Sequence, residues 1–124
     1  MTDLLVLADG QAGTPSQNTL ELLGAARRLA DATRGKVQAA VLESAATGLS
    51  PRVFAYGADQ VFRAEHSLLN RVRADAYVSV LAQVAGLAKA QIVLLADDSL
   101  GKELAPRLAH RLGAALITEA QGFA

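Results

Sequence analysis

Two glycine-containing segments follow apolar runs, and they are the places where this sequence could hold a phosphate. The first, DGQAGTPS, spans residues 9–16, and the second, DDSLGKE, spans residues 97–103. Glycines let backbone N–H groups approach a phosphate closely, and a lysine can reach its oxygens. The candidate nucleotide-binding residues are therefore Gly10, Gly13, Ser99, Gly101 and Lys102.

Neither segment completes a phosphate-binding motif. A dinucleotide fingerprint needs glycines at its first, third and sixth positions, and Gly10 and Gly13 give only a fragment of that spacing. The pattern GxxxxGK[ST] would need a glycine at Ala96 and a hydroxyl at Glu103, so it fails at two of its four fixed positions. The motif evidence for a nucleotide is weak.

Asp97 and Asp98 weigh further against a phosphate at the second segment. Two carboxylates at a helix start repel an anion unless a divalent metal intervenes, and little else in the sequence supports a metal. The same aspartates favour the positive end of a helix dipole, with Ser99 as the cap. We therefore favour capping and packing over ligand binding for this segment.

The residues available for catalysis are few. The chain has no cysteine, which excludes thiol chemistry, disulfides and thiolate metal sites. His66 and His110 are the only histidines, and neither has a nucleophile or second ligand at a suggestive spacing. We expect no catalytic residue, no metal site and no independent enzyme; an enzyme that a partner completes is the weakest alternative.

Five short apolar runs are typical of strands buried on both faces. Helical patterns lie between them, and this alternation predicts right-handed crossovers in one domain over residues 1–124. The expected fold is α/β, a three-layer open parallel sheet of about five strands with helices on both faces. The expected strands are residues 4–8, 37–42, 60–62, 92–96 and a last one near Leu116.

The first expected helix has Asn18 as its cap, Glu21 in a capping box, and Gly35 as its stop. A shorter second helix has Ser50 as its cap, Pro51 in its first turn, and Gly57 at its end. The apolar face of the first helix comprises Leu22, Leu23, Ala26, Leu29 and Ala30.

A third helix is expected from about Asn70 to Gly86. Its core stripe comprises Val72, Ala76, Val80 and Val84, supported by Tyr77 and Leu81. The last helix contains Pro106, so either it kinks there or its regular part begins near that residue. Its expected buried face is Leu104, Leu108 and Leu112, with Glu103 paired to Arg107 on the outside.

Charge and hydropathy limit the partners. Twelve basic and twelve acidic residues balance, so nucleic acid and anionic membranes are not expected partners. No apolar run approaches a membrane span, and the first residues lack a secretory signal, which favours the cytoplasm. The segment TEAQGFA continues past the expected last strand without a terminal helix to cover it, which suggests a module of a larger protein or a homodimer when isolated.

Four segments together resemble the amino-terminal domain of the alpha subunit of electron transfer flavoprotein. They are LLVLAD, TLELLGAARRLAD, AYGADQVF and, most specifically, SLGKELAPRLAHRLGAALIT. The resemblance implies an adenine nucleotide alpha-hydrolase-like fold. It also implies a scaffold that packs against a beta subunit and supports electron transfer from flavin dehydrogenases.

In that family FAD lies mainly in a carboxyl-terminal domain, whose binding segments have no counterpart here, so we expect no FAD on this chain alone. The beta subunit can hold AMP in the related fold. Asp97, Asp98, Glu103 and Glu119 depart from the family's usual residues, which disfavours AMP here. The alternative is a small adenine-nucleotide-binding module of the stress-protein type.

Overall fold

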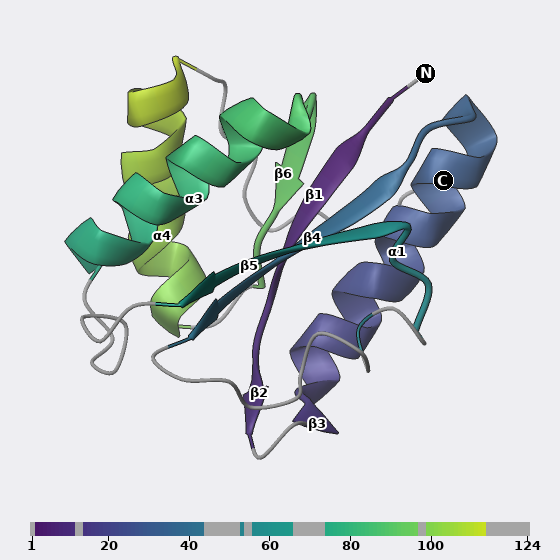
Figure 1. Cartoon of the computed structure of the whole chain (residues 1–124), viewed down its shortest axis with the longest axis horizontal. Helices are drawn as coiled ribbons and strands as arrows, with labels where there is room; N and C mark the ends of the chain where they lie inside the picture. Colours follow the sequence, from purple (N-terminus) through teal and green to yellow (C-terminus); the bar gives the residue numbers. More distant parts are fainter. Residues whose placement is uncertain are drawn as a thin grey trace.

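A parallel sheet of four strands forms the centre of the domain in the computed structural model (Figure 1). The strand order is β5-β4-β1-β6, and neighbouring strands pair in parallel. The strands are β1 (Leu4–Ala8), β4 (Val37–Glu43), β5 (Gln60–Glu65) and β6 (Ile92–Leu94). The structure describes residues 2–11, 14–43, 53, 56–65, 74–96 and 99–113.

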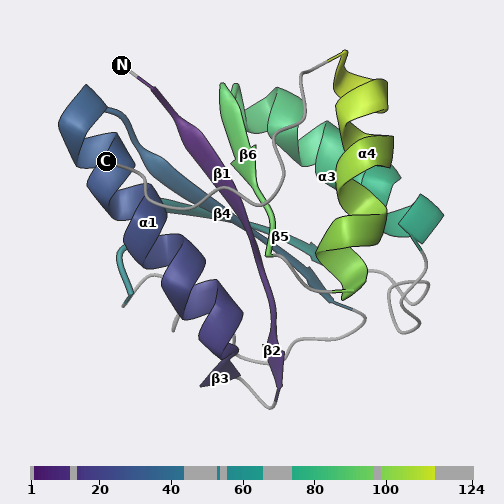
Figure 2. The ribbon, with the colours of Figure 1, turned by 180° about the vertical axis from the view of Figure 1, so that it is seen from behind.

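The continuous apolar runs arise because both faces of the central strands are covered. Leu4, Leu5 and Val6 of β1 are all fully buried, although successive side chains point to opposite faces. Leu4 and Val6 join the core cluster beneath α1 (Gln17–Thr33), whereas Leu5 joins the cluster beneath α3 (Ala74–Ala88) and α4 (Ser99–Leu112). Figure 2 shows these helices on opposite sides of the sheet.

This arrangement confirms the predicted α/β class with helices on both faces. The first four predicted strands are present, with bounds that differ by a few residues. The fifth predicted strand, near Leu116, lies outside the described residues. An unpredicted antiparallel hairpin, β2 (Gly10–Gln11) and β3 (Thr14–Pro15), follows β1 directly.

The start of α1 differs from the prediction. The cap is Ser16, not Asn18: Ser16 has an extended backbone, and its hydroxyl accepts a hydrogen bond from the Thr19 N–H at 3.1 Å. The predicted apolar face is confirmed, because Leu23, Ala26 and Ala30 are buried and the other two members pack against the same cluster.

Gly35 lies just after α1, as predicted, but close packing explains it. Arg34 makes the left-handed turn with a φ of 58°, and the N–H groups of Arg34 and Gly35 both donate to Ala30 O. A Cβ at Gly35 would lie 1.6 Å from the backbone oxygen of Thr2. Only glycine lets the helix end pass the chain entering β1.

The helix α3 extends beyond Gly86, where the prediction ended it, and the left-handed residue is Lys89, with a φ of 53°. Leu81 and Val84 of the predicted stripe are buried, and Ala76, Tyr77 and Val80 pack against the same cluster. Asn70 and Val72 lie outside the described residues.

The helix α4 runs through Pro106 from Ser99, so its regular part does not begin near the proline. Leu104 and Leu108 are buried as predicted, but Leu112 is 39% exposed because it is the last residue of the helix, beyond the apolar cluster. The predicted Glu103 to Arg107 ion pair is present, with N and O atoms 3.8 Å apart.

Little of the predicted second helix can be compared. Ser50 and Pro51 lie outside the described residues, as does His66. Val53 is fully buried in the cluster beneath α1, and Gly57 has a φ of 110°, which suits a glycine in the turn before β5.

Candidate functional site

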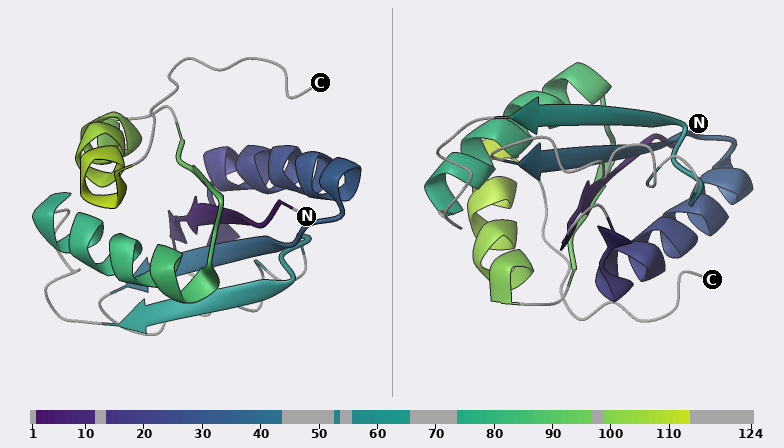
Figure 3. Two further views of the ribbon diagram at one scale, coloured as in Figure 1. Left: turned by 90° about the horizontal axis from the view of Figure 1, so that it is seen from above. Right: turned by 60° about the horizontal axis from the view of Figure 1, so that its bottom comes forward.

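The carboxyl ends of β1 and β6 meet where the strand order reverses. From β1 the chain proceeds to β4 on one side, and it later returns to β6 on the other. In open parallel sheets this is the usual place for a ligand. Figure 3 shows the start of α1 and the β2-β3 hairpin near this edge of the sheet.

The structure places most of the predicted site residues around this edge. Gly10 follows β1 at the start of the hairpin, and Ser99 is the first residue of α4 instead of the residue before it. Gly101 is buried and lines the crevice, whereas Lys102 is exposed. Gly13 lies outside the described residues. Two segments distant in the sequence thus converge, although their nucleotide-binding role stays a prediction.

The crevice between these segments is very small. It is lined by Leu7, Asp9, Ala96, Leu100 and Gly101 and has a volume of about 10 Å³. That is space for about one water molecule, whereas ligand pockets typically enclose about 300 Å³ or more. As shaped by the described residues, the crevice does not fit an adenylate or the larger FAD.

Asp9 connects β1 to the start of α1, a role that the sequence prediction missed. The Thr19 hydroxyl accepts from the Asp9 N–H at 2.8 Å and lies 3.0 Å from the Asp9 carbonyl oxygen and 2.9 Å from its Oδ1. The Ser16 hydroxyl also donates to this carboxylate, and the Ser16 N–H donates to the Asp9 carbonyl at 2.9 Å.

The carboxylate of Asp9 therefore lies at the amino end of α1. Unpaired N–H groups give this end of a helix a partial positive charge, which makes it a common phosphate site. Here Asp9 supplies the negative group from within the chain. The sequence held a clue: an aspartate directly after the first strand precedes two hydroxyl residues, Ser16 and Thr19, at cap spacing.

The pKa of Tyr77 in α3 is raised, mainly by burial and in part by the charge of Asp9. The negative charge of Asp9 in the crevice lining disfavours anionic ligands. Within the described ranges, no group of three or more His, Asp and Glu side chains could hold a metal ion that would reverse this charge.

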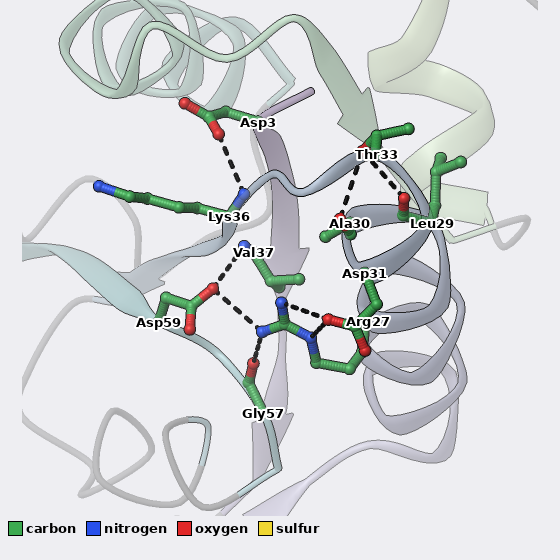
Figure 4. Close-up of polar contacts among 10 residues, drawn as sticks. All are labelled: Asp3, Arg27, Leu29, Ala30, Asp31, Thr33, Lys36, Val37, Gly57 and Asp59. Carbon is green, nitrogen blue, oxygen red and sulfur yellow. Dashed lines mark hydrogen bonds and ion pairs between the residues drawn. The ribbon is translucent and has the colours of Figure 1, made fainter. Parts of the chain in front are cut away.

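A second polar cluster, around Arg27, ties α1 to the turn before β5 (Figure 4). Arg27 Nη1 donates to Gly57 O at 3.1 Å and to Asp59 Oδ2 at 3.0 Å, and its Nη2 lies 2.9 Å from Asp31 Oδ1. Asp59 also accepts from the Val37 N–H at 2.9 Å. This cluster lies at the amino ends of β4 and β5, opposite the carboxyl edge where open parallel sheets usually bind ligands.

The electrostatics of this cluster favour its charged form. Burial alone would raise the pKa of Asp59, but the Val37 hydrogen bond and the adjacent Arg27 together lower it below its usual value. The hydrogen bond to Asp59 is the main cause of the raised pKa of Arg27.

His110 is exposed, as predicted. Separately, no described helix is long and apolar enough to cross a membrane.

The fold and crevice define a class: a three-layer α/β domain with an open parallel sheet, whose described residues leave a crevice of about 10 Å³ at the edge where such sheets usually bind ligands. The model of the electron transfer flavoprotein domain matches residues 3–124. The chain belongs to this family, which confirms the resemblance found in its sequence.

Curated relatives agree with this assignment. The chain is 29% identical over 121 residues to the electron transfer flavoprotein subunit alpha of Thermoanaerobacterium thermosaccharolyticum, a match that covers 98% of this chain and 37% of the relative. It is 33% identical over 114 residues to Protein FixB of Clostridium saccharobutylicum, covering 92% and 34%.

It is also 29% identical over 117 residues to the acryloyl-CoA reductase electron transfer subunit beta of Anaerotignum propionicum, covering 94% and 32%. The chain thus spans about a third of the length of the relatives it matches.

Proposed function

We propose that this chain is the scaffold domain of an alpha-type electron transfer flavoprotein subunit. It supports electron transfer from flavin dehydrogenases through FAD that another part of the assembly holds. The family match over residues 3–124 supports the subunit role. The observation that carries the scaffold role is the Asp9 carboxylate at the amino end of α1, beside a crevice of about 10 Å³.

The proposal includes two partners, a beta subunit and a carboxyl-terminal FAD-binding domain. The names of the relatives, which include alpha and beta electron transfer subunits, support a multi-subunit assembly. Residues 1–124 then form one domain that carries no catalytic group of its own. We place this assembly in the cytoplasm, and nucleic acid and membranes are not among its proposed partners.

Purification of the isolated chain tests the proposal. The preparation should lack flavin absorbance, and addition of an electron transfer flavoprotein beta subunit should shift the chain to a larger species in size-exclusion chromatography. FAD on the isolated chain at one equivalent would overturn the scaffold role. Failure to associate with a range of beta subunits, in the presence of the FAD-binding domain, would overturn the subunit role.

An adenine-nucleotide-binding module is the second candidate. One observation favours it: Asp9 and Gly101, from the two predicted loops, line the same crevice at the reversal of strand order. The size of the crevice and the charge of Asp9 make it the weaker proposal.

A further inference from the structure

Gln38 is a buried polar residue in the apolar part of β4. It is the second residue of the strand and is only 3% exposed. Val37 and Ala39, on either side of it, belong to the core cluster beneath α1, whereas Ala40 belongs to the cluster beneath α3 and α4. Because successive side chains of a strand point to opposite faces, Gln38 points to the face that α3 and α4 cover.

The side-chain oxygen of Gln38 accepts no hydrogen bond from the part of the chain that the structure describes. Its Oε1 atom is fully enclosed and lacks a donor among the described groups. An enclosed acceptor without a donor lowers the stability of the folded state, and most buried polar groups in proteins therefore have a partner. The Oε1 atom of Gln38 needs a donor of this kind.

The described side chains offer no buried donor. Thr19 is the only other polar residue that the described ranges bury, and its hydroxyl contacts Asp9 at the carboxyl edge of the sheet. Gln38 lies between Leu5 of β1 and Gln60 of β5 in the register, and the N–H groups that face one another in these strands are used in pairing. A donor from solvent remains.

Solvent has a short path to this amide. Gln38 is one residue from the amino end of β4, and its partner in the register, Gln60, is exposed. The cluster on this face includes small side chains from both layers, Ala40 of β4 and Ala85 of α3. Water molecules typically occupy interior places in which they satisfy a buried polar group.

We propose that Gln38 binds one ordered water molecule, which donates a hydrogen bond to its Oε1 atom. A water molecule carries two donors, so it satisfies Oε1 and keeps a second hydrogen for another acceptor or for solvent. The site lies at the amino end of the sheet, opposite the crevice beside Asp9. It is independent of the proposed subunit role.

Nuclear Overhauser effects between water and the unaltered chain, measured by NMR, test the site directly. The γ protons of Gln38, which do not exchange with solvent, should show an effect with the sign of a water molecule that tumbles with the protein. The γ protons of Gln60 and Gln83, which are exposed, are the controls and should show only surface hydration. Absence of the bound-water effect at Gln38 would overturn the proposal.

Two substitutions provide an independent measurement in urea denaturation. Gln38→Met keeps the side-chain length and removes the amide together with its water, so it should change the unfolding equilibrium constant less than about threefold. Gln60→Met should change it less than about twofold, because that side chain is exposed.

Either of two results from these variants would contradict the water site. Stabilisation of about tenfold or more by Gln38→Met would show that Oε1 has no donor at all. Destabilisation of about tenfold or more by Gln60→Met would show that the amide of Gln60 is the donor. If Gln38→Met does not fold, the measurement on the unaltered chain still decides.

Discussion

Thr19 and Asp9 hold the end of β1 against the start of α1. The Thr19 hydroxyl accepts from the Asp9 N–H at 2.8 Å, and its own proton can be donated to the carbonyl or carboxylate of the same residue. Thr19 is 1% exposed, so these bonds are shielded from water. The contact both fixes the first helix and keeps a negative charge at the ligand edge.

Thr19→Val should destabilise the domain by about 1–3 kcal/mol, because it keeps the side-chain shape but leaves the Asp9 N–H without its acceptor. Thr33→Val is the matched control. The Thr33 hydroxyl donates to Leu29 O at 3.0 Å, and that carbonyl belongs to the same helix. Its loss should cost less than about 0.5 kcal/mol in urea denaturation, and equal losses would show that the Thr19 contact is not special.

The ion pair between Arg27 and Asp59 should make the stability of the domain fall at acid pH. Because the folded pKa of Asp59 is lowered, its contribution is present above the unfolded pKa of about 3.9 and is lost as the pH falls through the folded value. Asp59→Asn should lower the free energy of unfolding by about 1 kcal/mol or less at neutral pH, since the Asp59 side chain is 42% exposed. It should also flatten the acid limb, which is the loss of stability as the pH falls.

Asp31→Asn is the control for that experiment, because Asp31 contacts the same arginine but its side chain is 67% exposed. Its effect should be about 0.3–0.5 kcal/mol, with the acid limb retained. Thermal unfolding between about pH 3 and pH 7 measures both variants. An unchanged acid limb in Asp59→Asn would show that other groups cause it.

Two glycine substitutions should change the free energy of unfolding in opposite directions. Gly35→Ala places a Cβ against the Thr2 backbone and should cost about 2 kcal/mol or more, because the chain entering β1 must move. Gly86→Ala has nothing within 4 Å and lies inside α3, so it should stabilise by about 0.5–1 kcal/mol. Midpoints of chemical denaturation give both values; a neutral Gly35→Ala would refute the close approach.

Pro106→Ala should stabilise α4 by about 1–3 kcal/mol. The proline lies inside the helix, where it provides no N–H for the carbonyl four residues earlier, and it is exposed, so little packing is lost. The melting temperature and the helical circular dichroism should both rise. A fall in stability would contradict this account of the proline.

Sequence patterns predicted the elements whose burial repeats along the chain. The runs that became β1 and β4 read as strands buried on both faces because helices do cover both faces. The burial of Leu104 and Leu108 was predicted correctly for the same reason. The burial of Leu112 was predicted wrongly, because periodicity does not reveal where a packed helix extends past its neighbours.

Contacts between distant segments were harder to predict. Asn18 begins a capping-box pattern with Glu21, whereas Ser16 does not. The bonds that Ser16 makes to Thr19 and to Asp9 nevertheless place the cap at Ser16. Gly35 marked the end of the helix, but its reason, the passing backbone of Thr2, depends on packing that no local pattern contains. Residues of both glycine-containing segments were named as one candidate site, but the small volume of the crevice between the segments could not be predicted from the sequence.

Calorimetric titration of the chain with AMP and ATP, with and without magnesium, tests the central claim most directly. Because Asp9 occupies the amino end of α1 and the crevice holds about 10 Å³, we predict no heat of binding and no rise in melting temperature. Saturable binding of one nucleotide per chain, accompanied by thermal stabilisation, would contradict the scaffold account.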